Sequence, residues 1–373
     1  MKILSLFANI GVAEAYLREI GVEVSVANEL IERRAKLYSA IYPETKMIAG
    51  DITNDAVFTQ IINAAREEMV DCIMATPPCQ GMSTAGQLDE DDERNRLVIP
   101  VIKAVHILKP NYIFIENVPN FFNTSIQVND KNILIPDYIN DELGNEYEIR
   151  KYIINTKDYS VPQVRERAIF LITKKGLDNI WVLPDPDKKI ITMRDAIGNI
   201  PSIDPFIKEE RDAMFPEYEA KKKRALKISR WNIPPHHVKR QVISMMHTPT
   251  GETAFDNKKY FPVKENGTPV KGYRNTYKRQ NWDTPAYTVT MDNRKISSQN
   301  NVHPGRYLGV DENGDTIYSD ARTLTLYELM LVMSLPSNWP VPEKTSEAFL
   351  RRIIGEGIPP LFVKKVFEQL IER

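Results

Sequence analysis

The stretch KILSLFANIGVAEAYLREIGVEVSVANELIERRAKLYSAIY, residues 2–42, runs through the same order of patterns twice. An apolar run at residues 2–8 is followed by an amphipathic stretch at 11–21. A second apolar run at 22–29 is followed by another amphipathic stretch at 30–42. Strands that alternate with helices are typical of a mostly parallel sheet with helices on both faces. This stretch therefore predicts an α/β fold.

The alternation continues to about residue 175. Further runs that are typical of strands occupy residues 71–78, 111–118 and 167–173, and residues 97–110 have the pattern of a helix. Residues 1–180 are therefore expected to form a Rossmann-like domain, in which ligands bind at the carboxyl ends of the strands.

Beyond this domain the pattern changes twice. Residues 185–310 are rich in Pro, Gly, Asn and aromatic residues without a sustained period, which predicts a smaller and irregular domain. Helical periodicity returns at residues 323–335 and 348–373. We therefore expect residues 311–373 to pack back on the first domain.

The composition is that of an ordinary soluble globular protein. The 373 residues are 42% hydrophobic and 27% charged, and no segment approaches the roughly 18 to 20 apolar residues of a membrane span. The first residues lack the basic region and cleavage site of a signal peptide. Two cysteines that stand close together, Cys72 and Cys79, could not staple a chain of this size. These features predict a cytoplasmic protein with reduced thiols, no membrane segment and no metal site.

The charge of the chain is segregated. Residues 221–300 contain 17 basic and 5 acidic residues, so their balance is +12, and that of the remainder is −13. Several tyrosines and two tryptophans stand among these basic residues. A run of charges is usually a solvated face, but a concentrated basic patch with aromatic residues on an acidic protein favours a nucleic acid as the partner.

Polar or glycine-containing turns follow the predicted strands. FANIG at residues 7–11 lacks the full G-x-G-x-x-G spacing, so a pyrophosphate site for a dinucleotide is not supported. Glu29 ends the second strand, where an acidic residue commonly binds ribose hydroxyls. Taken alone, Glu29 is equally consistent with a solvated carboxylate.

The sequence PPCQ at residues 77–80 ends the strand that begins near Cys72. Pro77 and Pro78 would stop that strand and restrict the loop that follows, because proline fixes φ and has no amide hydrogen. Cys79 would then be a presented side chain. A free cysteine is more often a buried structural thiol, and both interpretations remain open on this evidence alone.

The chain carries, in this order, the motifs SLFANIG, ANE, GDI, PPCQGMS, NRL, FIENVPNF, YSVPQVRERAIF, RTLTLYELMLVMSLP and IGEGIPPLF. This ordered set resembles the cytosine-5 DNA methyltransferase family. TMRDAIGNIP and WDTPAYTVT also resemble segments that flank the target-recognition region of many members. The resemblance implies the fold of a class I S-adenosylmethionine-dependent methyltransferase, with a target-recognition domain in the irregular region.

The resemblance implies a set of catalytic residues. Cys79 would add to carbon 6 of cytosine and make carbon 5 nucleophilic. Glu116 would donate a proton or a hydrogen bond to ring nitrogen 3. Arg165 would hold the carbonyl oxygen of the base, and Arg167 would support the catalytic loop. Because a stacked base is out of reach of a thiol, the cytosine would be flipped into the site.

The resemblance also implies S-adenosyl-L-methionine as the cofactor. Four positions depart from the usual family pattern and leave the methionine end of the site open, namely Ser5, Asn9, Val12 and Glu356. The residues implied to bind the cofactor are Phe7, Gly11, Glu29, Asp51, Ile52, Pro78 and Leu97.

Double-stranded DNA is the expected partner, and Gln80 and Ser83 are expected to reach it near the flipped base. A cognate restriction endonuclease would act separately, and the protein is expected to be a monomer. The other expected contacts are phosphate contacts by Lys221, Lys222, Lys223 and Arg224, and base contacts among Arg274, Lys278 and Arg279.

Three other functions are alternatives to this interpretation. An RNA cytosine methyltransferase would use identical chemistry, but the large basic region favours DNA. A DNA-binding relative without activity would be expected to lose Cys79 or Glu116, and both are present. A nicotinamide-dependent dehydrogenase is disfavoured by the incomplete glycine pattern.

Overall fold

The computed structural model describes residues 1–78, 92–208, 211–296 and 300–371. Its main element is a seven-stranded sheet, in which four neighbouring pairs are parallel and the two pairs that contain β9 are antiparallel. The predicted mostly parallel α/β sheet is therefore confirmed. In sheet order the strands are β3 (Lys46–Ala49), β2 (Glu23–Glu29), β1 (Lys2–Leu6), β4 (Cys72–Ala75), β5 (Tyr112–Asn117), β9 (Glu166–Lys174) and β8 (Tyr147–Asn155).

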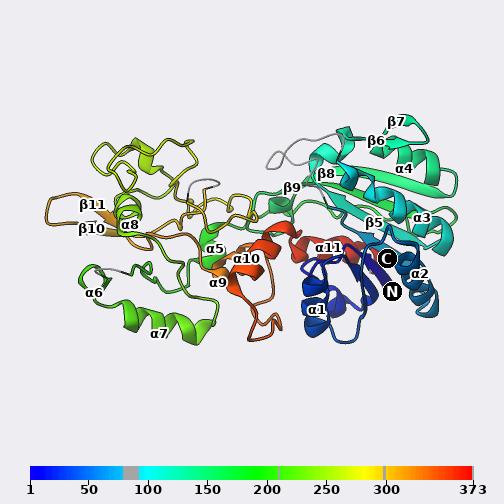
Figure 1. The fold of residues 1–373 in the computed structure, drawn as a ribbon, viewed down its shortest axis with the longest axis horizontal. Coiled ribbons are helices and arrows are strands. Elements are labelled where there is room, and N and C mark those ends of the chain that lie inside the picture. The colour runs from blue at the N-terminus through cyan, green and yellow to red at the C-terminus, as the bar shows by residue number, and fades with distance from the viewer. Residues whose placement is uncertain (79–91, 209–210, 297–299, 372–373) are drawn as a thin grey trace.

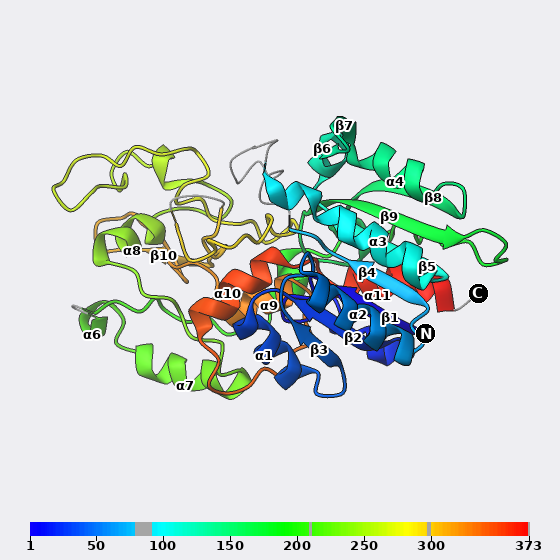
Figure 2. The same ribbon diagram turned by 45° about the vertical axis from the view of Figure 1, so that its right-hand side comes forward.

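Helices cover both faces of the sheet (Figures 1 and 2). Helices α2 (Asp55–Glu67), α3 (Val98–Leu108) and α4 (Ile135–Leu143) bury apolar side chains against one face. On the other face, α11 (Pro360–Ile371) packs on β1, β4 and β5, and α1 (Glu32–Ile41) contacts β2 and β3. The strands are thus buried on both sides, which is why they read as continuous apolar runs.

The first predicted helix is shorter than expected. Residues 11–21 contain only a single 3-10 turn, η1 (Leu17–Ile20), and the expectation of an amphipathic helix there is wrong. The cause is a buried polar contact: the carboxylate of Glu14 accepts hydrogen bonds from Ser5 and Tyr38. These contacts hold the chain in an irregular loop between β1 and β2.

The irregular region forms a second lobe, at the left in Figure 1. It has its own small core, to which α8 and residues 302 and 321 contribute, so the lobe includes chain on both sides of residue 310. Its elements are α5 (Met193–Ile197), α6 (Arg211–Met214), α7 (Tyr218–Ile228), α8 (Lys239–Met246), η5 (Ala254–Asp256) and the hairpin β10 (Tyr307–Val310) and β11 (Thr316–Tyr318).

Helices α9 (Leu326–Val332) and α10 (Glu347–Glu356) lie between the two lobes. One apolar cluster joins them to α5, to residues 282–289 and to residues 10–12 of the first turn. The end of α10 is thereby placed beside that turn. Smaller elements complete the first lobe: η2 (Glu93–Leu97), η3 (Pro119–Asn123), η4 (Thr156–Tyr159), β6 (Ser125–Val128) and β7 (Lys131–Leu134).

Within the described ranges, no helix has the length and hydropathy of a membrane span.

Candidate active site and cofactor site

A cavity of about 1310 Å³ lies at the carboxyl ends of the parallel strands. Predicted site residues from seven separate segments meet at its wall, although these segments are spread along the sequence from Phe7 to Arg167. Cys79, Gln80 and Ser83 fall outside the described residues. The predicted residues that line the cavity are Phe7, Glu29, Asp51, Ile52, Pro78, Leu97, Glu116, Arg165 and Arg167.

The carboxylate of Glu29 is held at the end of β2. It accepts hydrogen bonds from the backbone N–H groups of Asn9 and Ile31, each at 2.9 Å. Burial raises the pKa of Glu29, while the Ile31 N–H group and the Arg34 charge oppose that shift. The two backbone donors orient the carboxylate at the cavity wall, so the alternative that Glu29 is a solvated carboxylate is wrong.

Gly11 shapes the first turn from behind. It has φ of +77°, and a Cβ atom there would lie 2.1 Å from Cε2 of Tyr42. The hydroxyl of Tyr42 donates to the carbonyl of Gly11 at 2.6 Å. Gly11 is not among the residues that line the cavity, so its fit is to the Tyr42 ring.

The opposite part of the cavity holds an acid and an arginine. Glu116, near the end of β5, is 8% exposed, and its Oε1 lies 2.6 Å from Nε of Arg167. Arg165 donates instead to the carbonyls of Val289 and Gly355, at 2.8 and 3.1 Å. Arg167 is therefore the arginine beside Glu116. Arg165 links the beginning of β9 to residue 289 and to the end of α10, which lie between the two lobes.

Asn117 also lines the cavity, although the motifs did not predict it as a site residue. Its Nδ2 donates to the carbonyl of Pro77 at 3.0 Å, which fixes the end of β4 against the end of β5. The sequence feature that could have predicted it is its position directly after Glu116, at the end of a strand. This contact positions the chain that leads into Cys79.

Glu14 is buried in the loop that follows β1, and the pKa of its carboxyl group is shifted. Burial raises its pKa to about 7, against the effect of the hydrogen bonds from Ser5 and Tyr38. A carboxyl group whose pKa is higher in the folded than in the unfolded chain stabilises the fold most when it is protonated.

The free energy of unfolding is therefore expected to fall between about pH 4.5 and pH 8, with Glu14 contributing up to about 3 kcal/mol of that fall. Glu14→Gln should remove this part of the pH dependence, because an amide does not ionise. Chemical denaturation at pH 5 and pH 8 measures it, with Glu19→Gln on the exposed side of the same loop as the control. An identical pH dependence in wild type and Glu14→Gln would contradict the assignment.

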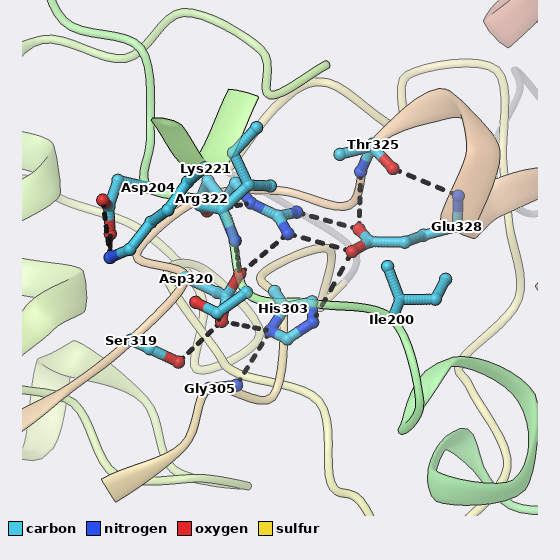
Figure 3. A network of polar contacts seen from close by, with 12 residues as sticks. Ile200, Asp204, Lys221, His303, Gly305, Ser319, Asp320, Arg322, Thr325 and Glu328 are labelled. Carbon is cyan, nitrogen blue, oxygen red and sulfur yellow. Dashed lines mark hydrogen bonds and ion pairs between the residues drawn. The ribbon is translucent and has the colours of Figure 1, made fainter. Parts of the chain in front are cut away.

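Two predicted DNA contacts are structural in the second lobe. Arg279 has no exposed surface and donates to the carbonyls of Met245, His303 and Asp320, so the prediction that it reads bases is wrong. Lys221 is engaged by Asp204 at 2.8 Å, at a half-buried position (Figure 3), and the prediction that it is a free phosphate contact is also wrong. The sequence shows where Lys and Arg residues stand, but it does not show whether they already donate to acceptors within the fold.

Figure 3 shows the polar network that contains Lys221, Asp320 and Arg322. Arg322 is fully buried and pairs with Asp320 at 2.9 Å and with Glu328 of α9 at 2.8 Å. Burial lowers the pKa of His303 to about 4, so its imidazole is neutral at pH 7. The network fastens the second lobe to α9, because buried charges are held by their partners.

The remaining basic candidates are on the surface. Lys223 and Arg224 are exposed on α7, and Lys222 lies over the Tyr218 ring. Arg274 is exposed and pairs with Asp256 at 2.7 Å, and the ammonium of Lys278 lies 5.6 Å from the centre of the Tyr287 ring. An exposed pair of this kind is weak, so Arg274 can exchange its partner for another anion.

Comparison with known proteins gives concordant results. A family model described as C-5 cytosine-specific DNA methylase matches residues 1–372. The Type II methyltransferase M1.HgaI of Avibacterium volantium is 43% identical over 372 residues, which cover 98% of this chain and 97% of that protein. The Type II methyltransferase M1.HphI of Haemophilus parahaemolyticus is 23% identical, with 99% and 86% covered.

Two solved structures share the fold over nearly their whole length. A putative DNA modification methyltransferase encoded within an E. coli prophage superposes with a TM-score of 0.68 at 19% identity, and all of both chains is covered. The S. pombe Dnmt2 methyltransferase superposes with a TM-score of 0.57 at 14% identity, with 100% of this chain and 98% of that chain covered.

Proposed function

Because the chain belongs to the C-5 cytosine-specific DNA methylase family, we propose that it transfers a methyl group from S-adenosyl-L-methionine to carbon 5 of a flipped cytosine within a specific duplex sequence. One observation supports the proposal beyond membership of the family. The Glu116–Arg167 pair and the Glu29 carboxylate, which is held by two backbone N–H groups, line the same cavity. A nucleoside cofactor and a target base would thus share one enclosed space.

The cavity wall fits the cofactor in its chemistry. Glu29 offers acceptor oxygens for ribose hydroxyls, Asp51 and Ile52 lie at the end of β3 for the adenine, and Phe7 lines the same part of the wall. Asn9 also lines the cavity, and its Oδ1 is buried without a hydrogen-bond partner in the described part of the chain. When bound, S-adenosylmethionine would supply the electrophilic methyl group.

The chain's own groups would activate the base. The Cys79 thiolate would add to carbon 6, and a hydrogen bond or proton from Glu116 to nitrogen 3 would offset the negative charge that develops on the ring. Once carbon 5 is methylated, loss of its proton and expulsion of the thiolate would restore the aromatic ring. Cys79 lies outside the described residues, so its role rests on the PPCQ motif and on the placement of Pro77 and Pro78.

We propose roles for the two arginines that differ from those first expected of them. Arg167 pairs with Glu116 and would hold both the acid and the carbonyl oxygen of the base. Arg165 has its terminal nitrogens on the carbonyls of Val289 and Gly355, and would keep the two lobes in register around the cavity. A guanidinium that already donates to two carbonyls has fewer donors for a substrate.

Target recognition is proposed for the second lobe. It carries the concentrated positive charge of the chain, and its small core extends to residue 321. Phosphate contacts by the exposed Lys223 and Arg224, with Lys222 beside them, would supply affinity, and Arg274 and Lys278 are candidates for base contacts. Gln80 and Ser83 are proposed to act close to the flipped base.

Neutralising α7 tests this role of the second lobe. Lys223→Gln with Arg224→Gln is expected to weaken binding to all duplex sequences alike and to lower the slope of log affinity against log salt by about 2, since two phosphate contacts are lost. The matched control is Lys174→Gln with Lys175→Gln, an equal charge change at the sheet edge opposite the cavity. Filter binding at several salt concentrations measures both. Equal slopes in the two double variants would contradict the role of α7.

The wider setting is proposed from the relatives. The names of M1.HgaI and M1.HphI describe Type II methyltransferases, and we infer that this protein protects cytoplasmic DNA from a separately acting endonuclease, as a monomer.

Bisulfite sequencing of DNA from cells that express the protein tests the whole proposal. Conversion-resistant cytosines in one recurring sequence are expected, and they should be absent with Cys79→Ser. Label from S-adenosylmethionine that enters RNA and not DNA would instead favour the RNA methyltransferase alternative.

A further inference from the structure

A short backbone ladder joins the start of β9 to the junction segment, residues 286–291. Residues 162–165, which lead into β9, run parallel to the first residues of this segment. The N–H of Ala286 donates to the carbonyl of Pro162 at 2.9 Å, and the N–H of Val164 donates to the carbonyl of Ala286 at 2.8 Å. The junction segment is therefore bonded directly to the chain that carries the two arginines.

Gln163 secures the ladder from a fully buried position. Its Oε1 accepts from the N–H of Val289 at 2.9 Å. Its Nε2 lies 3.4 Å from the carbonyl oxygen of Val332 and 3.0 Å from Sδ of Met333, both at the end of α9. Gln163 does not line the cavity, so any effect it has on the reaction passes through the residues that it holds.

Arg165 holds the same residue from its other side. The N–H of Val289 donates to Gln163, and the carbonyl of Val289 accepts from Nη1 of Arg165 at 2.8 Å, across 124 positions of the chain. Two positions after Arg165, Arg167 pairs with Glu116 at 2.6 Å. A displacement of Val289 would thus be passed to the start of β9 and to the acid that is proposed to act on the base.

The other side chains of the junction segment reach the surface at which DNA is proposed to bind. Tyr287 is 39% exposed, and its ring lies beside the ammonium of Lys278, a candidate for base contacts. Thr290 and Met291 line the cavity. The segment therefore connects a candidate base-reading residue with the site of the reaction.

We propose that Gln163 is a positioning residue that couples recognition of the target sequence to the rate of methyl transfer. The inference rests on the proposed function, which supplies the DNA substrate. The correct sequence holds the junction segment in the ladder and keeps Arg167 and Glu116 on the flipped cytosine. A wrong base pair displaces the segment and the pair with it, so that discrimination arises in the chemical step as well as in binding.

Gln163→Met tests the coupling, because it keeps the length of the buried side chain and removes its bond to Val289. Single-turnover rates are measured on duplex DNA with the target found by bisulfite sequencing, and on the same duplex with one recognised base pair changed. The ratio of the two rates is expected to fall by about 10- to 100-fold, the effect of a misplacement of about 1 Å at reacting groups. The affinity for the target duplex should stay close to that of the wild type.

Two variants separate this role from a merely structural one. Asn232→Leu also removes a fully buried amide, which accepts from the hydroxyl of Thr325 at the start of α9 at 3.0 Å and takes no part in the ladder. It should leave the ratio at the wild-type value. Gln163→Glu keeps an acceptor for the N–H of Val289 and should restore much of the ratio. Thermal unfolding shows which variants are folded.

Hydrogen exchange on the wild type gives a test that needs no variant. With S-adenosylhomocysteine present, the ladder amides of Val164, Ala286 and Val289 should exchange more slowly in the complex with the target duplex than in the complex with the altered duplex. Peptides from the hairpin β10–β11, at the far end of the second lobe in Figure 1, should exchange alike in both.

A wild-type ratio in folded Gln163→Met, an equal fall of the ratio in Asn232→Leu, or equal exchange of the ladder in the two complexes would overturn the coupling. None of these results would affect the proposed methyl transfer. If the wild type transfers no methyl group to duplex DNA, the proposed function fails and the coupling fails with it.

Discussion

Cys79→Ser is expected to lower methyl transfer by on the order of 10⁴-fold or more, as the loss of a covalent nucleophile does in other enzymes. A hydroxyl is far less ionised than a thiol at neutral pH, so it adds poorly to carbon 6 of cytosine. Transfer of labelled methyl groups to duplex DNA measures the rate. Calorimetry should show that the variant still binds S-adenosylmethionine, because the proposed role of Cys79 is to attack the base and not to bind the cofactor.

A trapping experiment gives the same nucleophile a second test. Duplex DNA with 5-fluorocytosine at the target position should form a covalent complex with the wild type that survives denaturing electrophoresis, because fluorine at carbon 5 cannot leave as a proton does. Cys79→Ser should form none. Cys72→Ser is the control, since Cys72 is a free cysteine buried in β4, where burial raises its pKa well above the usual value. Substantial turnover by Cys79→Ser would contradict the assignment of Cys79 as the nucleophile.

Glu116→Gln is expected to slow methyl transfer by about 10²- to 10⁴-fold, the usual contribution of a positioned proton donor. The amide has nearly the shape of the carboxyl group, but it cannot give up a proton to nitrogen 3 and it loses the ion pair with Arg167. Single-turnover rates on duplex DNA report the chemical step. Cofactor affinity should stay at the wild-type level.

Glu166→Gln is the matched control for this loss. Glu166 also lines the cavity and stands next to Arg167, but its side chain is exposed. The same change of group should leave the single-turnover rate as it is. A Glu116→Gln rate equal to that of the wild type would exclude Glu116 as the donor.

The motifs predicted the family, the class I methyltransferase fold and much of the cavity wall. Most of the predicted site residues line one cavity because they follow the carboxyl ends of parallel strands, and Arg165 and Arg167 join them because the antiparallel strand β9 begins at the same edge. Family membership and the fold are confirmed by the comparisons. The roles of the individual residues remain predictions that the variants above address.

The surface predictions were less successful, for a physical reason. Arg279 and Lys221 lie in the same basic region of the sequence as Lys223 and Arg224, yet Arg279 is enclosed by backbone carbonyls and Lys221 is paired with Asp204. Whether a cation is available depends on acceptors that other segments bring to it. Asp320, for example, stands 41 positions from Arg279.

Local patterns in the sequence predict the alternating strands and helices, and with them the edge of the sheet at which the cavity lies, because periodicity and strand ends are local properties. The motifs also predict the chemical groups expected there: a thiol after two prolines, a carboxyl group and a pair of arginines. Tertiary packing alone reveals which arginine lies beside Glu116, and that Arg34 and Glu356 meet across 322 positions of the chain. Such contacts arise where α1, α10 and the first turn pack together, and their distances depend on the packing of a common core that no local pattern encodes.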